Sequence, residues 1–285
     1  MRLSLFVLTI SLAAQPPDDF ETGFRLFSQD QFASAKGYLQ KAVAARPRSF
    51  QARFLLGATF IQLKDSKAAI VQLRQAVALN PGHLDARKLL AAQCVETGQF
   101  LEAVKLLQPV AETQPFDEET HLLLIEARQK SGDSTSAFAL AQKAARRFPS
   151  SAQVHAWLGF QLQFAGRYEE AMAPLNQALA LDPNFPMPLQ VLGEVYLKQE
   201  NFKEAAKWLE RAAAKMPGDV EILLLLGRAQ AEAGDTQQAI QTLKSAPKDA
   251  RVHFQLSRLY YILGDEAKAR EEAALSTKLR DAKRD

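Results

Sequence analysis

Residues 157–171 read WLGFQLQFAGRYEEA, and the spacing of Gly159, Gly166 and Ala171 within this stretch decides the fold. A glycine inside a helix costs about 1 kcal/mol relative to alanine. Gly159 nevertheless stands in the middle of a pattern that otherwise favours a helix. Because a similar arrangement returns at seven other places along the chain, the stretch is one copy of a repeated unit.

Prolines set the period of the repetition. Six of them follow one another at intervals of 34 residues: Pro47, Pro81, Pro115, Pro149, Pro183 and Pro217. With these prolines at position 32, repeats 1 to 8 occupy residues 16–49, 50–83, 84–117, 118–151, 152–185, 186–219, 220–249 and 250–283. The seventh repeat is shortened around the sequence SAPKDA, which predicts a trimmed second helix.

Small and apolar residues return at the same positions of most repeats. Position 20 is alanine throughout: Ala35, Ala69, Ala103, Ala137, Ala171, Ala205, Ala239 and Ala269. Position 8 is small in all but one repeat: Gly23, Gly57, Ala91, Gly159, Gly193, Gly227 and Ser257, with Ile125 the exception. We interpret positions 8 and 20 as the crossing point of two helices, where small residues let the backbones approach. Gly166, at position 15, is expected to end the first helix in a left-handed conformation.

This pattern resembles the tetratricopeptide repeat, a helix–turn–helix unit of 34 residues. The resemblance covers residues 16–283 and implies an all-α, right-handed solenoid of about eight helical hairpins. One departure is local, since the usual tryptophan at position 4 is absent and Trp157 stands at position 6 instead. Stacked repeats bury one another's apolar faces, so we expect a single solenoid domain over residues 15–285.

The N-terminal sequence MRLSLFVLTISLAAQPP predicts a signal peptide over residues 1–14. Arg2 precedes a short apolar run from Leu3 to Ala14, which ends in small residues, as in secretory signals. The run is too short to span a hydrocarbon core of about 30 Å as a helix. We therefore expect export to the periplasm or the medium, without a stable membrane span after cleavage; a buried N-terminal helix is the alternative.

Composition excludes several functions. The formal net charge is +3, and acidic and basic residues are mixed along the chain, which argues against a nucleic-acid partner. Cys94 is the one cysteine and is expected to be a small buried residue. The chain contains no phosphate loop, HExxH, CxxC or GxSxG motif. The sequence therefore predicts a protein without catalysis, with no catalytic residue, no metal and no cofactor.

The family resemblance implies a concave groove lined by positions 2, 5, 6, 9, 12 and 13 of each first helix. On this basis the predicted partner-binding residues are Phe54, Lys88, Leu122, Glu126, Trp157, Phe160, Phe164, Glu194, Leu224, Arg228, Phe254 and Arg258. Two interpretations of Trp157, Phe160 and Phe164 stay open: the rings fill the core, or they form an exposed anchor for a partner. Related proteins that clamp chaperone C-termini need a set of polar residues of which only Lys88 is present here.

These observations predict a non-enzymatic scaffold or adaptor that binds a protein or an extended peptide in its groove. Two other hypotheses remain. The groove could hold an envelope glycan during polysaccharide export, which a surface rich in polar and aromatic residues would favour. The chain could instead be a regulatory subunit of an enzyme complex, which would need a larger and drier interface.

Overall fold

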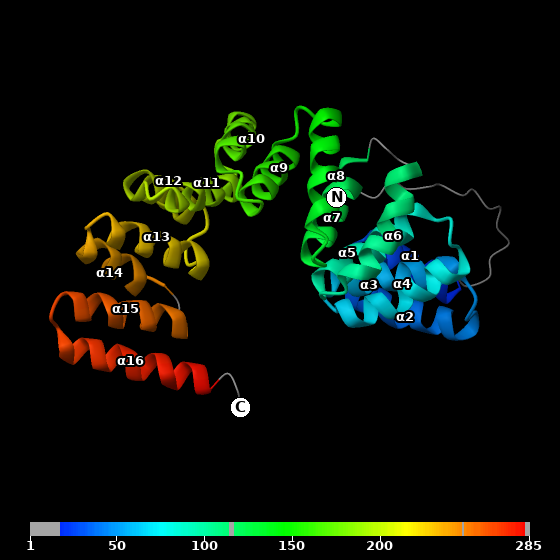
Figure 1. Ribbon diagram of the computed structural model, residues 1–285. Helices are drawn as coiled ribbons and strands as arrows, with labels where there is room; N and C mark the ends of the chain where they lie inside the picture. Colours follow the sequence, from blue (N-terminus) through cyan, green and yellow to red (C-terminus); the bar gives the residue numbers. More distant parts are fainter. Residues whose placement is uncertain (1–17, 114–116, 247, 283–285) are drawn as a thin grey trace. The chain divides into compact units, whose positions relative to one another are not determined.

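The computed structural model describes residues 18–113, 117–246 and 248–282, in which the chain forms sixteen helices and no strand (Figure 1). The helices are α1 (Asp19–Ser28), α2 (Phe32–Ala45), α3 (Phe50–Gln62), α4 (Ser66–Leu79), α5 (Leu84–Glu96), α6 (Phe100–Thr113), α7 (Glu118–Lys130), α8 (Ser134–Arg147), α9 (Ala152–Phe164), α10 (Tyr168–Leu181), α11 (Pro186–Lys198), α12 (Phe202–Lys215), α13 (Val220–Glu232), α14 (Thr236–Lys244), α15 (Ala250–Ile262) and α16 (Glu266–Asp281). The predicted signal peptide, residues 1–14, lies outside the described residues.

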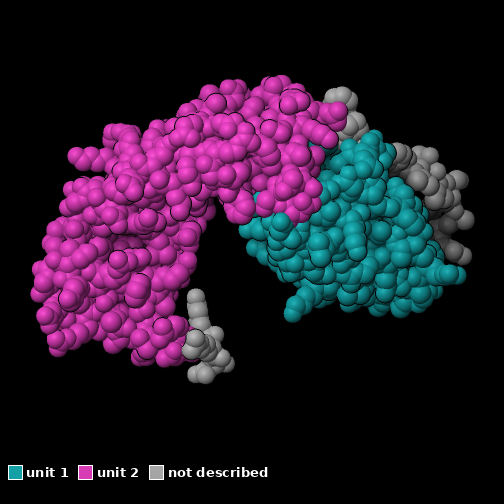
Figure 2. Space-filling view, in the orientation of Figure 1, with its two compact units in different colours: residues 1–132 teal, residues 133–285 magenta. Residues whose placement is uncertain are grey.

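The chain divides into two compact units, residues 1–132 and 133–285 (Figure 2). Helices α1 to α7 belong to unit 1, and helices α8 to α16 belong to unit 2. The division falls inside repeat 4, between Gly132 and Asp133. Each unit is described by itself, and the predicted single domain over residues 15–285 stays a prediction.

Helix boundaries follow the repeat. Odd-numbered helices are the first and even-numbered helices the second of each repeat, and polar side chains begin many of them. Ser49 Oγ, for example, accepts a hydrogen bond of 3.2 Å from the backbone nitrogen of Ala52, which satisfies a free donor at the start of α3. The predicted trimming of repeat 7 is confirmed, because α14 has 9 residues whereas α12 has 14.

Position 15 ends the first helix in every repeat with a positive φ angle. Gly166 has φ 74°, as predicted. The whole set is Asp30, Lys64, Gly98, Gly132, Gly166, Glu200, Gly234 and Gly264. The three residues other than glycine adopt the same left-handed conformation, so the repeat imposes this turn even where the side chain disfavours it.

The glycine at position 8 makes room for a leucine, which corrects the expected crossing at positions 8 and 20. A Cβ atom built on Gly57 would lie 2.7 Å from Cγ of Leu73, a residue at position 24 of the same repeat. Gly159 has the same relationship with Leu175. Ala171 is fully buried, but its side chain is not among the atoms nearest to Gly159. The glycine therefore accommodates the leucine side chain of the second helix.

Each helix contacts only its near neighbours along the chain. Within each unit the first helix of a repeat packs against the second, and the second packs against the first helix of the next repeat. Successive first helices also touch one another, as α9, α11, α13 and α15 do in unit 2. Successive second helices of the described chain make no such contact within either unit. The first helices therefore line the more tightly curved side of each unit.

Candidate functional site

The predicted binding residues of unit 2 lie on its first helices, on what we call the first-helix face. This face consists of positions 2, 5, 6, 9, 12 and 13 of α9, α11, α13 and α15. The predicted residues on it are Trp157, Phe160, Phe164, Glu194, Leu224, Arg228, Phe254 and Arg258. None of them is fully buried, so this surface keeps side chains in reach of a partner.

The three aromatic rings of α9 form a continuous row. The ring centroids of Trp157 and Phe160 are 5.5 Å apart with nearly perpendicular planes, and those of Phe160 and Phe164 are 6.3 Å apart and stacked. Phe160 packs against the core of unit 2, whereas 59% of Phe164 is exposed. The two interpretations left open by the sequence thus apply to different rings: Phe160 is anchored in the core and Phe164 is open.

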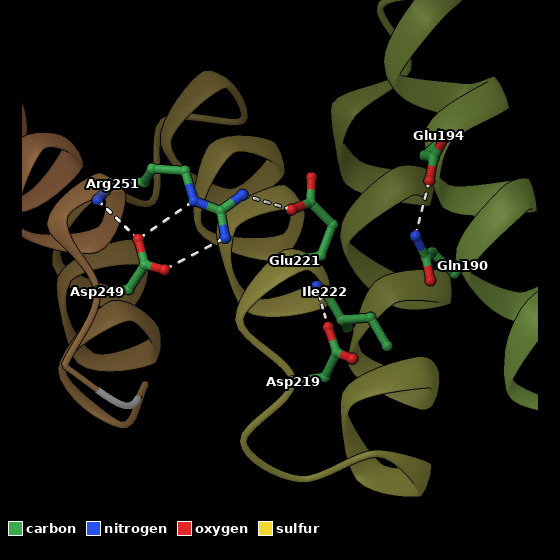
Figure 3. A network of polar contacts seen from close by, with 7 residues as sticks. All are labelled: Gln190, Glu194, Asp219, Glu221, Ile222, Asp249 and Arg251. Carbon is green, nitrogen blue, oxygen red and sulfur yellow. Dashed lines mark hydrogen bonds and ion pairs between the residues drawn. The ribbon is translucent and has the colours of Figure 1, made fainter. Parts of the chain in front are cut away.

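Next to this row, Glu194 is held by two glutamines. Its carboxylate accepts hydrogen bonds from Gln163 Nε2 on α9 at 3.2 Å and from Gln190 Nε2 on α11 at 2.9 Å (Figure 3 shows the second). Burial raises the pKa of the Glu194 carboxyl, although the hydrogen bond from Gln190 opposes the shift. Glu194 therefore ties α9 to α11.

Further along the same face, Arg251 joins α15 to α13. Its guanidinium donates to Glu221 Oε2 at 2.7 Å and to Asp249 Oδ1 at 3.2 Å (Figure 3). Glu221 and Arg251 both occupy position 2 of successive repeats, a spacing from which this pair could have been found in the sequence. The sequence analysis missed Arg251, Gln163 and Gln190, because it did not pair polar residues between neighbouring repeats.

Two other arginines of this face have no partner among the described residues. Arg228 on α13 and Arg258 on α15 are exposed, and within that part of the chain neither forms an ion pair or a side-chain hydrogen bond. Both line a hollow of about 400 Å³ between α13 and α15. Leu224 packs partly against the neighbouring core, whereas 55% of Phe254 is exposed.

In unit 1, the predicted residues are more occupied by contacts within the chain. Phe54 stacks on Phe50 at 5.6 Å, and the ring of His83 lies 5.3 Å from that of Phe54. Lys88 Nζ donates to Asp117 Oδ2 at 2.6 Å, so an acidic group already partners its charge. Leu122 and Glu126 are half-buried on α7. Unit 2 therefore offers the better candidate surface.

Family comparisons agree with the repeat pattern. Family models described as tetratricopeptide repeat match residues 122–186, 162–221 and 196–259. A further model, described as anaphase-promoting complex, cyclosome, subunit 3, matches residues 28–110. The chain is a tetratricopeptide repeat protein. No curated protein matches its sequence.

Solved structures of other tetratricopeptide repeat proteins share this fold. A thermophilic protein from Thermus thermophilus is 24% identical, with a TM-score of 0.52 over 64% of this chain and 100% of its own. A protein from Parabacteroides merdae is 11% identical, with a TM-score of 0.65 over 81% of this chain and 93% of its own. MamA from Desulfovibrio magneticus is 22% identical, with a TM-score of 0.52 over 58% and 96%. At these identities the similarity shows the fold: an all-α solenoid.

The tetratricopeptide fold suggests a protein–protein interaction scaffold, and members of the family are typically non-enzymatic. Among the described residues there is no cluster of three histidine, cysteine, aspartate or glutamate side chains able to hold a metal ion. A search of the same residues finds no helix with the length and hydropathy needed to cross a bilayer.

Proposed function

We propose that this tetratricopeptide repeat protein is an exported, non-enzymatic scaffold that holds an extended polypeptide segment of a partner on the first-helix face of unit 2. The observation that carries the proposal is the aromatic row of α9, in which a core-anchored Phe160 supports an exposed Phe164. Aromatic residues with a fixed base are frequent among the dominant residues of protein interfaces. An exposed phenylalanine held in this way offers a partner apolar contact at little cost in entropy.

The rest of the face supports a polypeptide partner. Apolar side chains alternate along it with amides, carboxylates and guanidinium groups, which suits a chain that offers both side chains and backbone hydrogen-bonding groups. Contacts within the protein hold Glu194 and Arg251 in place. A partner would therefore meet a surface that is largely ordered before binding, which lowers the entropic cost of association.

The binding test uses a partner that is purified with the mature chain from its natural source, identified, and then studied as a pure component. We expect Phe164→Ala to weaken its binding at least about tenfold, the loss typical of a dominant interface residue. The matched control is Leu181→Ala, because Leu181 is also exposed, at 41%, but lies at the end of a second helix. Retained affinity in Phe164→Ala would contradict the proposed site.

Export is tested separately by cell fractionation and N-terminal sequencing of the protein from its natural source. The apolar run from Leu3 to Ala14 supports a mature chain that begins close to residue 15, in the periplasmic or extracellular fraction. A chain that retains Met1 and stays in the cytosol would refute export and leave the binding proposal intact.

A further inference from the structure

The two arginines of unit 2 that lack a partner among the described residues recur at the same place in successive repeats. Arg228 is position 9 of repeat 7, and Arg258 is position 9 of repeat 8. Both line the hollow of about 400 Å³ between α13 and α15. The hollow is otherwise lined mainly by apolar or small residues: Gly227, Ala231, Leu243, Leu259 and Ile262.

These arginines differ from other cations on first helices, which acidic groups of the chain neutralise. Arg251, on the same helix as Arg258, bonds to Glu221 and Asp249. Lys88 of unit 1 bonds to Asp117 in the same way. The guanidinium groups of Arg228 and Arg258 therefore remain available to an anionic group from outside the chain.

The acidic groups near the hollow do not cancel this charge. Among the described residues, Glu232 is the one carboxylate that lines it, against two arginines. Glu266 lines an adjoining hollow of about 580 Å³, which also includes Arg258 and Ile262, but its carboxylate already bonds to Arg270 at 2.7 Å. A net positive charge is thus left beside an apolar lining.

Exposed apolar side chains surround the same place. Ile262 is 66% exposed and Tyr261 is 71% exposed, and both line the hollow that adjoins Arg258. Phe254, on the preceding turn of α15, is 55% exposed. A polypeptide that covered these residues would remove apolar surface from water while it approached the arginines.

We propose that the α13–α15 part of the first-helix face binds a polypeptide segment in which acidic side chains flank an aromatic or aliphatic residue. The carboxylates bond to Arg228 and Arg258, and the apolar residue enters the hollow beside Ile262. This inference rests on the proposed scaffold function and specifies the chemistry of the partner. Arginine suits the role because its planar guanidinium donates two parallel hydrogen bonds to a carboxylate.

The experiment measures binding of three labelled synthetic peptides to the full chain by fluorescence anisotropy. The first peptide has aspartates on both sides of a phenylalanine and a leucine, the second has asparagines in place of the aspartates, and the third has lysines. All three are amidated, so that no terminal carboxylate contributes. We expect the aspartate peptide to bind at least about tenfold more tightly than the asparagine peptide, with weaker binding as salt is raised.

Arginine variants locate the contact. We expect Arg228→Gln and Arg258→Gln each to weaken binding of the aspartate peptide about tenfold, the loss of one charge-assisted hydrogen-bonded pair. The matched control is Arg146→Gln, which removes the same charge from an exposed position on α8 and should leave binding unchanged. Because all three side chains are exposed, thermal melting should not change.

The alternative outcomes are distinct. Equal affinity for the aspartate and asparagine peptides, or unchanged binding in both arginine variants, overturns the acidic specificity. Absence of binding by all three peptides also overturns it. In each case the scaffold function is judged independently, by the effect of Phe164→Ala on the purified natural partner.

Discussion

The side chain of Leu175 on α10 packs directly onto the backbone of Gly159 on α9. Leu39, Leu73, Leu209 and Leu243 stand in the same relationship to Gly23, Gly57, Gly193 and Gly227. In each case a Cβ atom on the glycine would come within 3.0 Å of the leucine side chain. This contact within the hairpin explains why a residue that is unfavourable in helices recurs at position 8.

Gly57→Ala should destabilise the protein by about 1–3 kcal/mol, because the new methyl group overpacks the contact with Leu73. This loss exceeds the gain of about 1 kcal/mol in helix propensity. Gly37 is the matched control, since it lies exposed in α2 with no atom within 4 Å of its built Cβ. Gly37→Ala should be stabilising in the same urea titration, and a stabilising Gly57→Ala would refute the packing explanation.

The ion pair between Lys88 and Asp117 should contribute to stability, because both side chains are about four-fifths buried, with 19% and 18% exposed. Burial acts to raise the pKa of Asp117, but bonds from Lys88 and Thr120 outweigh it and lower this pKa. Lys88→Met should cost about 1–3 kcal/mol at neutral pH, since it leaves the carboxylate without its main partner.

A double-mutant cycle with Asp117→Asn checks this coupling by chemical denaturation. The double variant should lose less stability than the sum of the single losses. Because the pKa of Asp117 is lowered on folding, its contribution is complete above its unfolded pKa. The contribution disappears as the pH falls through the folded pKa. Additive losses would show that the two residues act independently.

Glu194 is expected to reduce stability at neutral pH. Burial raises the pKa of its carboxyl, so the folded chain holds this proton more firmly than the unfolded chain. Stability therefore falls as the pH rises from the unfolded pKa through the folded one. Glu194→Gln should remove this part of the pH dependence, because the amide oxygen can still accept a bond from Gln190. Urea midpoints measured across the acidic range test it, and identical profiles would contradict it.

Cys94 should be unreactive in the folded protein. Burial raises the pKa of its thiol to about 11, and the negative charge of Glu102 adds to the shift. Since the thiolate is the reactive form, a thiol reagent should label the chain at neutral pH only at the rate of unfolding. The denatured chain is the control and should react at once. Rapid labelling of the folded chain would show that Cys94 is accessible.

The sequence predicted the features that the repeat imposes locally. Position 15 turns, buried alanines such as Ala171 and the trimmed α14 follow from period, backbone conformation and residue size. The leucine contact of Gly159 was missed because residues sixteen apart meet only once the hairpin has closed. A signal for it exists in repeat 8, where Ser257 replaces the glycine and Ala273 replaces the leucine.

The candidate site was predictable in place but not in detail. Helical spacing put Trp157, Phe160 and Phe164 on one face, yet spacing alone could not say which ring would meet the core. That depends on how far the neighbouring helix covers each side chain. Similarly, the available charges of Arg228 and Arg258 and the neutralised charge of Lys88 depend on partners brought together by stacking.

Contacts that reach no further than the second neighbouring helix leave the number of hairpins free to change during evolution. Duplication or deletion of one hairpin would disturb only the two junctions beside it, since locks such as Gly193 with Leu209 lie inside a single hairpin. New ligand preferences could then arise by reordering first helices as cassettes, each bringing its own surface residues, without redesign of the interior.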